Sequence, residues 1–118
     1  MRVEFKNRHS FENRLNESQS IMCKYPNRLP IICEKNKDCK ITISLSKVKY
    51  LIPFTMLVGE FILYIRRTIN INKEQGIYLF INGNIPCTSD NFFNLYQNYK
   101  NNDGFLYIIY TYENTFGC

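Results

Sequence analysis

The sequence predicts a single α+β domain. Residues 11–24 and 56–69 repeat apolar positions at helical spacing, whereas residues 77–81 and 105–110 are continuous apolar runs of strand length. Two shorter, half-polar segments with strand character lie between the two helical patterns. A chain of 118 residues that is 45% hydrophobic is long enough to bury a core without disulfides or metals. Helices and strands that alternate irregularly in this way are typical of the α+β class.

The first long helix is predicted at residues 11–24, after a shorter helix near residues 3–8. Ser10 is a suitable N-cap, and Pro26 ends the helix. The polar face includes Arg14. The opposite face carries Phe11, Leu15, Ser18 and Met22, with Ile21 beside it.

A β-hairpin is predicted from residues 28–35 and 47–52, with a polar loop between them and Pro53 as the end of the second strand. A strand with lysines on one face is typical of a sheet edge, because lysine discourages unwanted pairing there. Strand alternation places Val48, Tyr50 and Ile52 on one face and Lys47, Lys49 and Leu51 on the other.

The central helix at residues 56–69 has its apolar positions on one face, and Thr55 is expected to cap it. Residues 77–81 are uniformly apolar, which predicts a strand buried on both faces, and Asn82-Gly83 predicts a tight turn after it.

Ser89 is expected to cap a further helix that runs to about Lys100, before a second buried strand at residues 105–110. A hairpin, a helix across it and two more strands make a β-grasp arrangement, here with two additional N-terminal helices. We divide the chain into a helical extension at residues 1–26, the β-grasp domain at residues 27–113 and a flexible tail at residues 114–118.

The positive charge is concentrated in the first half of the chain. Residues 1–50 hold eleven Lys and Arg against five Asp and Glu, whereas residues 51–118 hold four against five. No basic run exceeds two residues, so we expect no nucleic-acid partner. A basic face favours acidic peptides or anionic headgroups. A merely solvated surface is the alternative.

Several functional classes find no support in the sequence. The five cysteines form no C-x-x-C pair and His9 is the only histidine, so we expect no metal and no cofactor. A thiol enzyme using a cysteine with His9 would need a third group to orient the base, and we expect no enzyme. The charged N-terminus lacks an apolar signal region, so we expect the chain to be made in the cytoplasm.

An ordered set of motifs resembles the autophagy ubiquitin-like modifiers, the family of GABARAP, the microtubule-associated light chain proteins and the yeast autophagy-related ubiquitin-like protein. As a set they are highly specific and cover nearly the whole chain. They are Lys24-Tyr-Pro-Asn-Arg-Leu-Pro-Ile-Ile-Cys-Glu-Lys35, Lys49-Tyr-Leu-Ile-Pro53, Val58-Gly-Glu-Phe61, Ile65-Arg-Arg67, Phe80-Ile-Asn-Gly-Asn-Ile-Pro86, Leu95-Tyr96, Asp103-Gly-Phe-Leu-Tyr107 and Phe116-Gly117.

The resemblance implies a ubiquitin-like β-grasp protein made as a precursor. In this family a processing cysteine protease exposes a C-terminal glycine, activating and conjugating enzymes carry it as a thioester, and it is finally joined to phosphatidylethanolamine. The anchored domain then recruits receptors and adaptors through aromatic-x-x-aliphatic peptides. We expect a monomer, on the membrane of the autophagosome or another vesicle after conjugation. In some parasites the family serves a plastid-like organelle membrane instead.

Gly117 fits the conjugation site, because glycine has no side chain to obstruct enzymes that handle the terminal carbonyl. Cys118 is then the residue removed. On residues alone, Phe116-Gly117-Cys118 is better explained as a frayed terminus, and it is the resemblance that favours the conjugation site. A peptide-binding adaptor that is never conjugated is the alternative function.

The resemblance also implies two peptide pockets along the edge strand, which an extended peptide could join by main-chain hydrogen bonds. The first, for the aromatic residue, comprises Glu17, Ile21, Pro30, Ile32, Lys49, Leu51 and Phe105. The second, for the aliphatic residue, comprises Tyr50, Ile52, Pro53, Met56, Phe61 and Tyr64. Acidic residues of the peptide would meet Arg28, Lys47, Lys49 and Arg66. Simple core packing is the alternative role for the apolar members.

Two of these positions depart from the family pattern. Tyr64 and Met56 stand where the family usually has leucine, and the loop at residues 36–46 is one residue longer than usual. A tyrosine at the rim predicts a narrower second pocket with an altered peptide preference.

Overall fold

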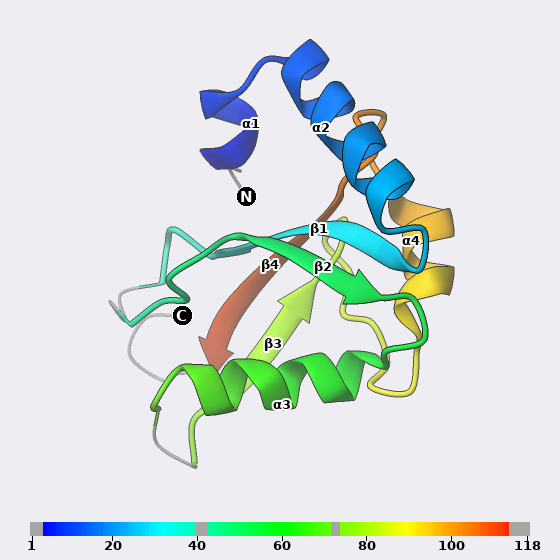
Figure 1. The fold of residues 1–118 in the computed structure, drawn as a ribbon. Coiled ribbons are helices and arrows are strands. Elements are labelled where there is room, and N and C mark those ends of the chain that lie inside the picture. Colours follow the sequence, from blue (N-terminus) through cyan, green and yellow to red (C-terminus); the bar gives the residue numbers. More distant parts are fainter. Residues whose placement is uncertain (1–3, 40–42, 72–73, 114–118) are drawn as a thin grey trace.

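Four strands form one mixed sheet in the order β2-β1-β4-β3 (Figure 1). The computed structural model describes residues 4–39, 43–71 and 74–113. The strands are β1 (Arg28–Lys35), β2 (Lys49–Pro53), β3 (Gly76–Phe80) and β4 (Leu106–Glu113). The helices are α1 (Glu4–Arg8), α2 (Phe11–Lys24), α3 (Val58–Thr68) and α4 (Phe92–Tyr99).

The central strands β1 and β4 are parallel, and each has an antiparallel neighbour at the edge. Helix α3 crosses one face of the sheet, and α1 and α2 lie over the other (Figure 1). The main core fills the space between the sheet and α3, and its buried cluster includes Phe61 and Ile65 of α3 together with alternate residues of β4. This is the predicted β-grasp with two additional N-terminal helices, and the α+β class is confirmed.

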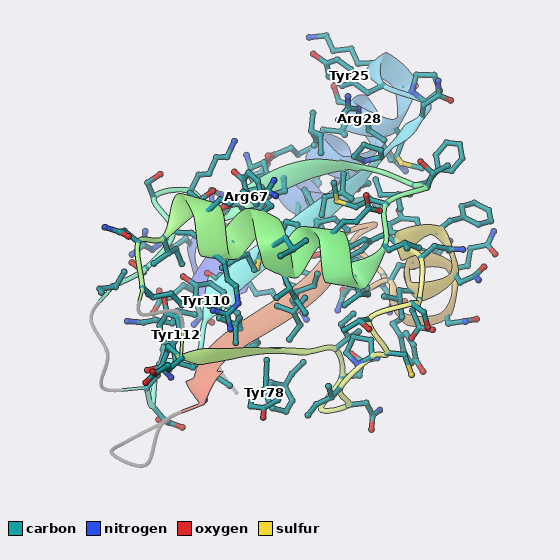
Figure 2. The ribbon with its side chains drawn as sticks, turned by 90° about the horizontal axis from the view of Figure 1, so that it is seen from below. Tyr25, Arg28, Arg67, Tyr78, Tyr110 and Tyr112 are labelled. Atoms are coloured by element: carbon teal, nitrogen blue, oxygen red, sulfur yellow. The ribbon has the colours of Figure 1, made fainter. Side chains whose placement is uncertain are left out.

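Strand β3 differs from its prediction, because it is an edge strand exposed on one face and is not buried on both. Tyr78 is 39% exposed, whereas its neighbours Ile77 and Leu79 are buried. Figure 2 shows Tyr78 on the side of β3 away from α3. The turn after β3 is as predicted: Asn82 and Gly83 both have positive φ, which suits a tight hairpin turn.

The caps of the two later helices were predicted wrongly. Helix α3 begins at Val58 with Leu57 as its N-cap, and the Glu60 carboxylate accepts a hydrogen bond of 2.9 Å from the Leu57 N–H. Thr55 therefore does not cap it. Helix α4 is capped by Asn91, whose side chain accepts from Asn94 N at 2.8 Å, and Ser89 precedes the cap.

Helix α2 is fixed to the sheet through the loop before β4. Arg14 was predicted to lie on the polar face of α2, but it is paired with a buried residue: its Nη1 lies 2.6 Å from Oδ2 of Asp103. Ser18 Oγ donates a 2.5 Å hydrogen bond to Asp103 O. Gly104 has φ +87° and its Cα faces Ser18, so a Cβ there would stand 2.3 Å from Ser18 Oγ. Tertiary contacts therefore hold the helical extension against the domain.

Candidate functional site

Strand β2 leaves one edge of the sheet open. Its observed range, Lys49–Pro53, begins two residues later than predicted and includes Pro53, which pairs with Arg28. A proline is compatible with this position because edge strands need not use every N–H. The pairing on the other side is antiparallel, with β1 alone.

The phase of the ladder shows which backbone groups face the open edge. Cys33 N donates to Val48 O at 2.8 Å, so Val48 points its carbonyl toward β1. Since N–H and C=O groups alternate in direction along a strand, Tyr50 and Ile52 also face β1, whereas Lys49 and Leu51 face outward. The open edge thus presents backbone donors and acceptors at two alternate residues.

A cavity of about 430 Å³ lies beside this edge. Its apolar floor is formed by Tyr50, Ile52 and Phe61, which are buried, and Pro53 and Met56 are partly exposed at its wall. All six residues predicted for the second pocket line it: Tyr50, Ile52, Pro53, Met56, Phe61 and Tyr64. An apolar hollow next to unpaired backbone is suited to an extended peptide with one apolar anchor.

Tyr64 lines this cavity from the α3 side. Its ring stacks on Phe61 with centroids 5.8 Å apart and an interplanar angle of 15°. It also meets the edge of Tyr50 at 5.9 Å. Burial raises the pKa of the Tyr50 hydroxyl, which donates to Lys47 O at 2.9 Å and therefore stays neutral. The three rings form a rigid aromatic wall.

Three of the four predicted basic residues line the same cavity. Arg28, Lys47 and Lys49 lie along its rim. Arg28 Nη1 donates to the outward-facing Leu51 O at 3.2 Å, and Lys47 Nζ lies 5.2 Å from the Tyr50 ring centroid. Positive charge therefore surrounds the open backbone.

Arg66 is placed differently from the other three basic residues. Its Nη2 donates to Gln75 O at 2.5 Å, near the end of α3, and Arg66 is not among the residues that line the cavity. A side chain engaged with the backbone in this way is poorly placed to meet a peptide in the groove.

The first predicted pocket is closed in this structure. Ile32 and Phe105 are fully buried, and the Phe5 ring from α1 packs on them with a centroid distance of 5.3 Å to Phe105. An ion pair between Glu17 and Lys49 joins α2 to β2. Entry of an aromatic side chain between α2 and β2 therefore requires this exposed ion pair to separate, which costs little free energy.

Sequence reasoning missed the part that α1 plays here. Phe5 N donates to Glu34 Oε2 at 3.2 Å, so a carboxylate on β1 satisfies a free N–H in the first turn of α1. Desolvation raises the pKa of this Glu34 carboxyl. The sequence signal was an isolated aromatic residue in a short polar helix, and nothing local to it indicated a partner on β1.

The predicted conjugation residue Gly117 and the predicted cleavage residue Cys118 lie outside the described residues, as does the predicted tail at residues 114–118. Strand β4 leads directly to this segment. None of the helices in the described part of the chain has the length and apolar character that crossing a bilayer requires.

Comparisons with known proteins match the whole chain. A family model described as "Autophagy protein Atg8 ubiquitin like" matches residues 13–117. Autophagy-related protein 8 of Mycosarcoma maydis is 44% identical over 117 residues, covering 99% of this chain and 98% of the relative. The protein of the same name from Schizosaccharomyces pombe is 45% identical over 117 residues, covering 99% and 96%.

Solved structures agree with the sequence matches. Trypanosoma brucei ATG8 superposes with a TM-score of 0.91 at 33% identity, covering 99% of this chain and all of that one. Plasmodium falciparum Atg8, solved with a P. falciparum Atg3 peptide, gives a TM-score of 0.80 at 38% identity and covers 93% and 95%. In sequence and in fold alike, the chain belongs to the Atg8 family of ubiquitin-like autophagy proteins.

Proposed function

We propose that this chain is a ubiquitin-like modifier and no enzyme, that it is cut after Gly117 and that it is joined there to phosphatidylethanolamine on autophagosomal membranes. The anchored domain then recruits receptor and adaptor proteins. The observation that carries the recruiting role is the open edge of β2, where the backbone of Lys49 and Leu51 faces no neighbouring strand and lies beside an apolar cavity.

The receptor segment joins the sheet as an extra strand. Its aliphatic side chain enters the cavity beside Pro53, and its aromatic side chain separates Glu17 from Lys49 to reach the first pocket. Since the aromatic site lies near the start of β2 and the aliphatic site near its end, the peptide runs parallel to β2. Acidic residues before the aromatic position meet Lys47 and Lys49, which favours association by charge.

A conjugating enzyme is an expected partner of the same surface. The P. falciparum relative was solved with a peptide of Atg3. A short segment that binds β2 would hold the enzyme on the domain while the tail after β4 remains available for transfer. The protease that removes Cys118 and the activating enzyme complete the expected set.

Backbone pairing can be tested with peptides that carry single N-methyl groups, titrated by calorimetry against the whole chain. Methylation removes one N–H. In parallel pairing it should therefore abolish binding at the peptide residues opposite Tyr50 and Ile52, whose N–H groups point to Lys49 O and Leu51 O, and have little effect at the alternate residues. Lys49→Ala should weaken binding of acid-flanked peptides, whereas Lys100→Ala, which changes an exposed lysine that does not line the cavity, should not. Equal effects of methylation at every position would contradict strand addition.

Mass spectrometry of the cellular protein tests conjugation. We expect loss of Cys118 and a mass increment that matches a phospholipid on Gly117, both absent from a Gly117→Ala variant. A chain that keeps its full mass, and whose membrane association is unchanged by Gly117→Ala, would instead be an adaptor that is not conjugated.

A further inference from the structure

Two aromatic residues, Phe93 exposed and Phe54 partly exposed, lie immediately beyond the end of the proposed peptide groove. Phe54 follows the last residue of β2, and Phe93 lies in the first turn of α4. Their ring centroids are 5.7 Å apart, with an interplanar angle of 55°. Phe93 is 41% exposed, and Phe54 is partly exposed. We call Phe54 and Phe93 the aromatic pair.

The backbone holds the aromatic pair rigidly. Phe93 N donates to Phe54 O at 3.1 Å, and Phe92 N donates to Met56 O at 3.0 Å. Val58 N donates to Asp90 O at 2.9 Å, so the segment after β2 and the segment before α4 run side by side. A surface that is fixed before binding loses little conformational entropy when a partner arrives.

Core packing does not explain Phe93. Helix α4 is already anchored by Phe92, Leu95 and Tyr96, all of them buried. Phe93 projects from the other side of this helix, where a polar residue would satisfy the fold equally well. An exposed aromatic residue on an anchored helix is informative when it continues an apolar surface.

The aromatic pair adjoins the second pocket along the chain. Pro53 and Met56 line the cavity, and Phe54 lies between them in the sequence. Met56 also accepts the hydrogen bond from Phe92 that positions α4. The cavity and the aromatic pair therefore share one segment of chain. Figure 1 shows the end of β2 and helix α4 at the same end of the molecule.

The chemistry of the surface changes along this path. The groove beside β2 carries Arg28, Lys47 and Lys49. The residues next to the aromatic pair in the chain include the uncharged Thr55, Asn91 and Asn94, and Phe54 N donates to the O of the uncharged Asn27 at 3.4 Å. The nearest carboxylates are engaged, since Glu60 accepts from Leu57 N and Asp90 accepts from Cys87 N, both at 2.9 Å. The groove beside β2 therefore suits acidic residues of a peptide, whereas the surface at the aromatic pair suits an uncharged apolar side chain.

We infer that the aromatic pair is a third subsite, which takes an apolar side chain that lies C-terminal to the aliphatic residue of the receptor peptide. This inference rests on the proposed function, in which the peptide runs parallel to β2. A peptide that continues in that direction leaves the sheet edge at Pro53 and passes Phe54 and Phe93. At the rise of an extended chain, about 3.3 Å per residue, the side chain in question lies within about five residues of the aliphatic position.

Two peptides test the third subsite. One peptide ends at the aliphatic residue. The other continues for about five residues, a length based on the rise of an extended chain. These added residues are serines, except for a single leucine that is placed at each position in turn. We expect one leucine position to tighten binding to the whole chain about tenfold, as a buried apolar anchor does. Phe93→Asn should remove this gain and leave the affinity for the shorter peptide unchanged. Phe11→Asn, an exposed phenylalanine of α2, is the matched control.

The outcomes separate the third subsite from the groove itself. If neither peptide binds the unmodified chain, the proposed function fails together with the inference. If both bind with equal affinity at every leucine position, or if the gain survives Phe93→Asn, the groove stands and the third subsite is overturned. Self-association that Phe93→Asn abolishes, with no change in peptide binding, would assign the aromatic pair to a second copy of the chain and also overturn it. Thermal unfolding of each variant confirms that the fold is intact.

Discussion

Arg14 and Asp103 form the ion pair that fastens α2 to the sheet, with 2.6 Å between Nη1 and Oδ2. Asp103 is fully buried and Arg14 is nearly so. Removing one partner leaves the other charge buried and uncompensated, so Arg14→Ala should lower the free energy of unfolding by about 3 kcal/mol. Urea denaturation followed by circular dichroism measures this loss.

Arg8 supplies the matched control. Its ion pair with Glu4, at 3.6 Å, is exposed to solvent. Exposed pairs of this kind contribute about 0 to 1 kcal/mol, so Arg8→Ala should change the free energy of unfolding far less than Arg14→Ala. Equal losses in the two variants would contradict the fastening role of Arg14.

Gly104→Ala should be strongly destabilising. A left-handed conformation at φ +87° strains any residue with a side chain, and the new Cβ would also stand 2.3 Å from Ser18 Oγ. We expect a loss of about 3 kcal/mol in urea denaturation. Gly83→Ala shares the positive φ but meets no atom within 4 Å, so it should cost only about 1 kcal/mol. A smaller loss of stability for Gly104→Ala than for Gly83→Ala would contradict a clash between the new Cβ and Ser18.

Glu34→Gln should change how stability depends on pH. Desolvation raises the pKa of Glu34 above its ordinary value of 4.5, because Oε1 is buried without a hydrogen-bond partner in the described residues. Ionisation is therefore disfavoured more in the folded state than in the unfolded state. The contribution of Glu34 is fully present below pH 4.5 and is lost as the pH rises through the folded-state pKa.

Glutamine keeps an oxygen for the Phe5 N–H and cannot ionise. The free energy of unfolding of Glu34→Gln minus that of the unmodified chain should therefore rise between about pH 4 and neutrality and then level off. Denaturant titrations at a series of pH values measure this difference. A constant difference across that range would contradict the assignment.

Tyr64→Leu should widen the second pocket. Replacing the ring that stacks on Phe61 removes part of the aromatic wall. The unmodified chain should favour valine over larger aliphatic residues at that peptide position, and the variant should improve binding of the larger residues about tenfold, the usual effect of one or two methylenes in a fitted pocket. Equal affinities of the two proteins across a peptide panel would contradict a role for Tyr64 in selection.

Local patterns predicted the elements well where the signal lies within the element itself. Ser10 and Pro26 correctly predicted where α2 begins and ends, and helical spacing predicted the bounds of α3 to within two residues. Arg14 was misplaced because its partner Asp103 is 89 residues away, and no local rule reports such a partner. Tyr78 was misplaced because a continuous apolar run does not reveal whether its strand lies in the centre or at the edge of the sheet.

The predicted site divides in the same way. The residues of the second pocket line one cavity. Strand alternation predicts that Tyr50 and Ile52 share one face of β2, and helical spacing predicts the face of α3 that carries Tyr64. The closure of the first pocket by Phe5 could not be predicted, because it depends on how α1 docks. Arg66 was misplaced because its bond to Gln75 O depends on the course of the chain after α3.

The position of β4 between β1 and β3 has a consequence for biosynthesis. Until residues 106–113 have left the ribosome, the hairpin of β1 and β2 has no contact in the sheet with β3, so the sheet cannot be completed before β4 has been made. The strand that completes the sheet also directly precedes the tail. A product truncated before β4 would therefore lack the strand that pairs with both β1 and β3.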